Sequence, residues 1–209
     1  MSNYKGRHLK EELVQKTVRL GAILSIYLGI PSLILAGVIP WGMKFVALVA
    51  GTVFMYLLAR ILGEANADLG LTWLKARDSL LAVAPLTLAL IVASIIFLVA
   101  NGARFYPTEG LGFFVFYIFV SCPAQELLFR GVLANFLSTF KFGQHLEAVI
   151  ASLLFGFVHI IYRDALTVVV MTIVGLFWYR AYKKAPSLLG VTVSHIILGV
   201  LTIAVGLVD

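Results

Sequence analysis

The chain has 209 residues, of which 61% are hydrophobic and 12% charged, with a formal net charge of +6 and a mean hydropathy of +1.02. Soluble domains carry roughly 25% charged residues, so this composition lacks the polar surface that a soluble fold needs and excludes one. The basic residues are scattered between apolar runs, which argues against a nucleic-acid-binding protein and indicates membrane topology instead.

The apolar runs predict an all-α fold, a polytopic transmembrane bundle of about seven helices. A helix needs about 20 apolar residues to cross a bilayer, which is close to the length of these runs. Only helices and closed barrels pair all their backbone groups in lipid, and the runs lack the alternation of polar and apolar residues that barrel strands show. The runs lie at residues 17–38, 41–62, 79–100, 111–140, 146–161, 165–182 and 187–208.

Residues 1–209 are expected to form a single integral membrane domain, because no linker, repeat or low-complexity tract divides them. Residues 1–16 predict a cytoplasmic N-terminal segment, since this stretch is too long and too charged for the n-region of a signal peptide. Leu9, Leu13 and Val18 leave two alternatives open for its surroundings, a solvated lead-in and an interfacial helix with an apolar strip. The single cysteine, Cys122, excludes an intrachain disulfide.

The Lys and Arg residues between the runs predict which helix ends face the cytoplasm. With a cytoplasmic N-terminus, the segments on that side hold twelve of them, and the segments on the opposite side hold Lys44, Arg104 and Arg163. The remaining one, Arg130, lies within a run. We therefore expect a multi-pass protein with its N-terminus in the cytoplasm, in the plasma (inner) membrane if the source is bacterial.

The fourth run carries a charged and polar stretch, PAQELLFR, at residues 123–130. Glu126 and Arg130 are four residues apart, so on a helix they share a face and can pair, which makes their burial tolerable. Pro123 has no N–H, so we expect the helix to bend just before Gln125. Taken alone, this pair is also compatible with a salt bridge that merely fixes helix packing.

Two later runs each carry one histidine within a stripe of small and polar residues spaced by three and four. Small residues let another helix come close, so both stripes are expected to face the bundle interior. A lone histidine on such a face is more often a hydrogen-bonded packing residue than a ligand or a base. The fifth run has Ser152, Phe155, Gly156 and His159, and the seventh has Thr192, His195, Gly199, Thr202 and Gly206.

Glu126, His159 and His195 come from three different runs but lie at similar depths, within a few turns of mid-membrane at about 1.5 Å per residue. Ionisable residues at that depth cost about 2.5–3.5 kcal/mol each on insertion scales, so they mark functional sites. One shared site explains all three better than three separate packing contacts. A carboxylate and two imidazoles are the groups that hold and activate a water, by general-base catalysis or with a metal.

Three segments resemble the motifs of the CAAX prenyl protease type II and bacteriocin-processing (CPBP, or Abi) family of intramembrane proteases. They are QELLFRG at 125–131, FGFVH at 155–159 and HIILG at 195–199, beside the family patterns Glu-Glu-x-x-x-Arg, Phe-x-x-x-His and His-x-x-x-Asn. The likeness covers about 121–200. It implies Gln125, Glu126, His159 and His195 as catalytic positions, with Arg130, Phe155 and Gly199 in support.

The resemblance also implies a helical bundle around a water-filled cavity that opens toward the cytoplasm. In the family, the first Glu and the first His activate water, and the last His and the Asn hold the oxyanion. The resemblance implies a membrane-associated or prenylated protein or peptide as substrate. It assigns no metal ligand and leaves a divalent metal such as zinc as an open alternative.

Two positions depart from the family pattern. Gln125 stands in the place of the presumed general base, and an amide cannot hold a proton at neutral pH, although it can orient a water. Gly199 stands in the place of the Asn, and loss of one oxyanion donor typically lowers the rate about a hundred- to a thousandfold.

These departures leave three functional hypotheses. The first is an active endopeptidase with Glu126 as base, and the second is a non-catalytic relative that serves as a membrane scaffold or self-immunity binding protein. The third, a small transporter, lacks the repeat symmetry that carriers show. A Glu126 carboxylate within reach of His159 through a water favours the first. A carboxylate directed at Arg130, with Gln125 facing the two histidines, favours the second.

Overall fold

The computed structural model describes the backbone of residues 2–208 and the side chains of residues 9–208. That part of the chain is helical and contains no strand, which confirms the predicted all-α class. Six helical segments are long and apolar enough to cross a membrane, and a shorter seventh, Leu188–Ala204, follows them. The six are Leu9–Leu35, Trp41–Ile61, Ala76–Asn101, Leu111–Ser138, Gln144–Tyr162 and Ala165–Lys184.

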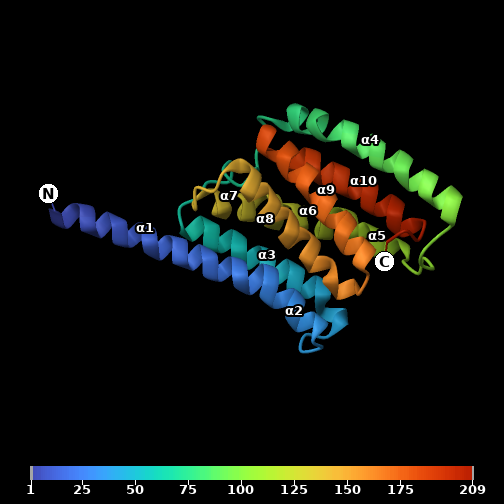
Figure 1. The fold of residues 1–209 in the computed structure, drawn as a ribbon, viewed down its shortest axis with the longest axis horizontal. Coiled ribbons are helices and arrows are strands. Elements are labelled where there is room, and N and C mark those ends of the chain that lie inside the picture. The colour runs from blue at the N-terminus through green and yellow to red at the C-terminus, as the bar shows by residue number, and fades with distance from the viewer. Residues whose placement is uncertain (1, 209) are drawn as a thin grey trace.

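The elements of the first half form three long helical rods. They are α1 (Ser2–Ile23), the π-helix η1 (Leu24–Gly29) and α2 (Ile30–Leu35); the 3₁₀ turn η2 (Trp41–Met43) with α3 (Lys44–Ile61); and α4 (Ala76–Asn101). In Figure 1, the beginning of α1 extends beyond the rest of the bundle. Leu9 and Leu13 in this part are 71% and 66% exposed. No other described segment of the chain therefore covers the apolar strip that was considered for an interfacial helix.

The second half contributes the fourth rod and the three helices that follow it. These elements are α5 (Leu111–Phe116), the π-helix η3 (Tyr117–Ser121), α6 (Cys122–Glu126), the π-helix η4 (Leu127–Val132) and α7 (Leu133–Ser138); α8 (Gln144–Phe157) with the 3₁₀ turn η5 (Val158–Tyr162); α9 (Ala165–Lys184); and α10 (Leu188–Ala204). Figure 1 shows α4 and α10 along one side of the bundle and α1 to α3 along the other, with α8 and α9 between them.

Prolines are accommodated in two of the rods by π-helical turns. Pro31 follows η1, and Pro123 follows η3, each in the first turn of the next α-helix. A proline ring clashes with the carbonyl four residues earlier in an α-helix, and a π turn inserts one extra residue that changes this spacing. The predicted irregularity before Gln125 is therefore a π turn, and a second one, η4, begins directly after Glu126.

Glycines allow α8 and α9 to pack closely against each other. A Cβ atom at Gly156 would overlap the side chain of Thr172, and one at Gly175 would lie 2.9 Å from the Phe155 ring. The connection between the two helices is capped by Asp164, whose carboxylate accepts from the Thr167 amide and pairs with Arg104. Hydrogen bonds from Thr167 and the Arg104 charge keep the pKa of Asp164 below its usual value. The close approach fixes α8 against α9, and η5, which follows α8, carries His159.

Candidate active site

A cavity of about 140 Å³ lies between the helices of the C-terminal half, α4 and the start of α3, and we call it the active-site cavity. Its lining includes Gln125, His159 and His195, which come from the fourth, fifth and seventh runs. The sequence predicted that these runs would meet, and the structure brings these three side chains to one cavity. Gly199 and Thr202 of the seventh-run stripe also line it.

Glu126 lies behind the cavity and is absent from its lining. The carboxylate is fully buried, and its Oε1 atom accepts hydrogen bonds from His195 Nδ1 at 2.6 Å and Arg130 Nη1 at 3.1 Å. The predicted Glu126–Arg130 pair is therefore present. The carboxylate is directed at Arg130, as in the second arrangement set out above, but it also bonds to His195, which neither arrangement included. Neither arrangement is therefore met in full.

The buried guanidinium of Arg130 is covered by aromatic rings. Its Cζ atom lies 4.1 Å from the centroid of the Phe155 ring and 5.1 Å from that of Trp178. Cations are attracted to the faces of such rings, more strongly where water is excluded. Phe155 therefore packs against Arg130, and its supporting role stays a prediction. Trp178 also packs against Arg130 but had no distinguishing signal in the sequence, because it is one aromatic residue in an apolar helix.

The hydrogen bonds of the two histidines assign their tautomers. His159 Nδ1 lies 2.8 Å from the carbonyl oxygen of Phe155, and His195 Nδ1 faces the Glu126 carboxylate. Carbonyl and carboxylate oxygens accept hydrogen bonds, so Nδ1 carries the proton in both rings. In the neutral form of each ring, Nε2 is then a free acceptor. Both residues line the active-site cavity.

His195 is fixed from behind by a polar chain across three helices. Its ring lies 4.9 Å from the Trp178 ring, centroid to centroid. Trp178 Nε1 donates to Ser194 Oγ at 3.0 Å, and Ser194 Oγ lies 2.7 Å from Thr87 Oγ1 on α4. These contacts join α4, α9 and α10 around the imidazole and limit its movement.

Tyr117, Ser121 and Gln125 form a polar row on one face of the fourth rod, and all three line the cavity. Gln125 Nε2 donates to Ser121 Oγ at 3.0 Å. A Cβ atom at Gly199 would overlap the Tyr117 hydroxyl, so Tyr117 fills space that a larger residue at 199 would need. Sequence reasoning missed Tyr117 and Ser121, although they lie eight and four residues before Gln125, a regular spacing that was a readable signal.

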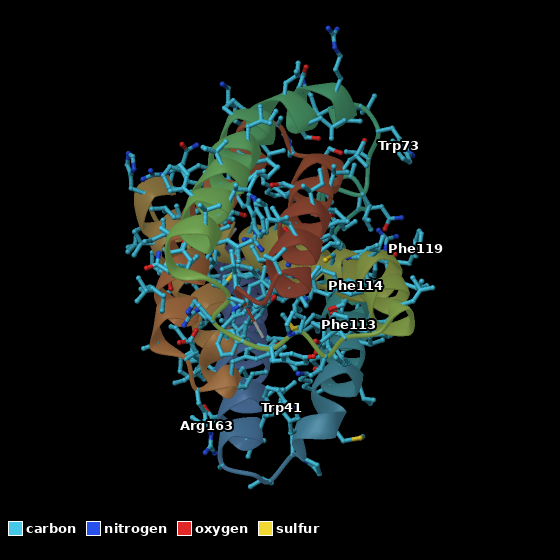
Figure 2. All side chains as sticks on the ribbon, turned by 90° about the vertical axis from the view of Figure 1, so that its right-hand side faces the viewer. Trp41, Trp73, Phe113, Phe114, Phe119 and Arg163 are labelled. Carbon is cyan, nitrogen blue, oxygen red and sulfur yellow. The ribbon has the colours of Figure 1, made fainter. Side chains whose placement is uncertain are left out.

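A second cavity of about 100 Å³ lies on the other side of Gln125 and His159 and is mostly apolar. Lys44 lines both cavities, and its Nζ lies 3.7 Å from the Trp41 ring centroid and 4.9 Å from that of Tyr162. Figure 2 shows Trp41 and Arg163 on the same side of the bundle as α2 and α3, whereas Trp73 lies on another side. Tyr162 and Lys44 thus line both cavities at that side.

The donor set of the active-site cavity does not fit a catalytic zinc ion. Such sites use three protein ligands, and in residues 9–208 no group of three or more His, Cys, Asp or Glu side chains is arranged to hold a metal. His159 and His195 offer two nitrogens, but the carboxylate of Glu126 is bound to His195 Nδ1, and Glu109, which also lines the cavity, does not complete a group of three with them. No step of the proposed chemistry is therefore assigned to a metal.

Comparison with known proteins supports the resemblance of the sequence motifs. Residues 106–201 match the family model described as "Type II CAAX prenyl endopeptidase Rce1-like". The matched region runs from the segment before α5 into α10 and so includes every helix that carries Gln125, His159 and His195. No curated protein and no solved structure matches the chain.

Proposed function

Residues 106–201, slightly under half of the chain, match the Rce1-like family, and on this premise we propose that the chain is a CPBP-type intramembrane endopeptidase in which a histidine activates the attacking water. One observation carries the proposal. The fully buried Glu126 carboxylate lies 2.6 Å from His195 Nδ1, while the His195 ring lines the cavity. Glu126 is then a positioning residue rather than the base that the sequence suggested.

His195 is the proposed general base. A carboxylate bound to Nδ1 fixes the tautomer and the direction of an imidazole and stabilises the cation that forms when Nε2 takes a proton. In this scheme the water oxygen attacks the scissile carbonyl carbon as His195 Nε2 takes one water proton. That proton then passes to the leaving amide nitrogen as the C–N bond breaks. His159 Nε2 and the Gln125 side chain orient the same water.

The Tyr117 hydroxyl is the proposed donor to the tetrahedral oxyanion. It occupies the space beside Gly199, one turn after His195, where the family pattern has an Asn. A phenol O–H is a hydrogen-bond donor of the required kind. The neighbouring apolar cavity, beyond Gln125 and His159, would take an apolar part of a membrane-associated substrate. A prenylated substrate is proposed from the family description alone.

The experiment compares Glu126→Gln with a matched buried carboxylate outside the cavity, Glu147→Gln. Glu147 is 5% exposed and also pairs with a cation, Lys183. Purified protein in vesicles is incubated with a pool of prenylated and unprenylated membrane-bound peptides, and products are mapped by mass spectrometry. We expect Glu126→Gln to lower the cleavage rate about a hundredfold or more, because the His195 tautomer and charge lose their support. An unchanged rate for Glu126→Gln would rule out the positioning role.

A non-catalytic function is the second candidate, and one observation favours it. Gln125, rather than a carboxylate, lines the cavity at the position of the family base. In this case the chain binds a membrane protein or peptide as a scaffold or self-immunity protein. Wild-type protein would then cleave no member of the pool, and His195→Ala would leave partner binding unchanged. Cleavage that disappears in His195→Ala would eliminate this candidate.

A further inference from the structure

A third cavity, separate from the candidate active site, lies where α8 begins and α9 ends. Its volume is about 410 Å³, within the range of roughly 300–1,000 Å³ that ligand sites occupy. The two helices pack side by side, as Figure 1 shows, and η5 joins them at the opposite end. We call this space the basic cavity, because its lining includes His145, Tyr179, Arg180, Lys183 and Lys184.

The positive charge of the basic cavity is only partly balanced within the chain. Glu147 is buried beside it, and its Oε2 atom lies 3.3 Å from Lys183 Nζ and accepts from the Tyr179 hydroxyl at 3.2 Å. This carboxylate therefore offsets Lys183. Among the ion pairs within residues 9–208, none joins Arg180 or Lys184 to a carboxylate. Two cations at one cavity without an acidic partner predict an anionic ligand.

The position of these cations on α9 distinguishes a lipid from a soluble anion. Phe177 and Ile173 lie one and two turns before Arg180 on the same face, and they are 46% and 51% exposed. On α8, Val149 is 44% exposed one turn after His145. An apolar exposed surface thus continues directly from the basic cavity along both helices. A ligand with a negative head and apolar chains matches both parts.

We propose that the basic cavity binds the phosphate group of an anionic phospholipid, whose acyl chains lie against the exposed faces of α8 and α9. The Arg180 guanidinium presents a planar fork of donors that matches phosphate oxygens, and Lys184 adds a second positive charge. Basic pockets at the ends of transmembrane helices bind such headgroups. The bound lipid would stabilise the α8–α9 pair, whose connecting turn η5 carries His159, independently of whether the protein is an active protease.

The test measures thermal unfolding of the full chain in a neutral detergent by tryptophan fluorescence. Phosphatidylglycerol, phosphatidylcholine and inorganic phosphate are added separately to the wild type, to the double variant Arg180→Gln/Lys184→Gln and to Lys75→Gln/Arg77→Gln. The last variant removes the same charge from exposed positions around the start of α4, outside the basic cavity. Bound lipids are also counted by native mass spectrometry.

We expect phosphatidylglycerol to raise the Tm of the wild type and of Lys75→Gln/Arg77→Gln, and phosphatidylcholine and phosphate to have little effect. Binding to Arg180→Gln/Lys184→Gln should be about thirtyfold weaker, since two interfacial cations are lost. Equal loss in both variants would indicate a general charge effect and overturn the proposal. If inorganic phosphate raised the Tm as much as phosphatidylglycerol does, the ligand would be a soluble anion and not a lipid. If phosphatidylglycerol did not change the Tm of the wild type, the proposed site would be refuted.

Discussion

At the scale of single residues, Tyr117 has the most informative surroundings in the cavity. Its ring stacks on Phe113 with centroids 5.7 Å apart and meets the His195 ring edge-on at 6.1 Å. The side chain is 8% exposed and its hydroxyl lies against Gly199. These contacts fix a phenol O–H beside the proposed base. A donor held in advance at the place where charge develops stabilises a transition state more than a mobile one.

Replacing Tyr117 by Phe removes this hydroxyl and keeps the ring. If Tyr117 supplies the oxyanion donor, kcat should fall about a hundred- to a thousandfold with little change in KM, since the bond forms in the transition state. Cleavage of the peptide pool in vesicles measures both parameters. Tyr182→Phe is the control, because Tyr182 is a buried tyrosine outside the cavity. A change confined to KM would assign Tyr117 to substrate binding instead.

At the scale of helices, the α10–α4 contact is built on one glycine. A Cβ atom at Gly190 would overlap the backbone carbonyl of Ser79. The Gly190 N–H, in the first turn of α10, donates to Ser79 Oγ at 3.1 Å and so has a partner that the helix itself cannot supply. This contact sets the position from which α10 carries His195 into the cavity.

Gly190→Ala should therefore destabilise the bundle by about 1–3 kcal/mol, because rigid backbone atoms of α4 would have to move away from the new methyl group. Thermal unfolding in detergent measures the difference. Gly21→Ala serves as the control, since a Cβ atom at Gly21 in α1 meets nothing within 4 Å. It should be neutral or stabilise by about 0.5–1 kcal/mol, as alanine favours a helix interior. Equal Tm values for both variants would contradict the packing argument.

Helix geometry also explains which part of the site the sequence could not predict. The similar depth of Glu126, His159 and His195 was readable from their runs, and the structure brings the two histidines to one cavity, with Gln125 in its lining instead of Glu126. The direction of Glu126 was not, because π turns lie on both sides of Cys122–Glu126. Each inserted residue rotates the following face by about 100°, and apolar sequence gives no sign of the insertion.

At the scale of the whole molecule, hydropathy predicts the number and order of the helices well, but it predicts the residues at which they begin and end less well. The third run was expected at 79–100, whereas α4 spans Ala76–Asn101 and includes Asp78, an acidic residue that the positive end of the helix dipole favours in the first turn. The seventh run was expected at 187–208, but α10 ends at Ala204. Gly206 has a φ of +69° and its carbonyl accepts from Arg104 and Phe105, so a loop contact ends the helix there.

The side of the membrane on which each helix end lies stays a prediction from the Lys and Arg distribution. The two ends of α4 test it directly. The helix has 26 residues, which is about 39 Å at 1.5 Å per residue and enough to cross a hydrocarbon core of about 30 Å. Arg77 and Asn101 are exposed near its ends, and the native Cys122 is fully buried. Cysteines introduced at these two positions therefore report opposite sides against a silent background.

We expect Arg77→Cys to react with a membrane-impermeant maleimide only from the cytoplasmic side, in inverted vesicles. Asn101→Cys should react only from the outside, in intact cells. The wild type, with Cys122 alone, is the control for background labelling. The reversed pattern would place the N-terminus outside and move the basic cavity away from the cytoplasmic leaflet, whose anionic lipids would otherwise supply its ligand. Labelling of both positions from one side would mean that α4 does not cross the membrane.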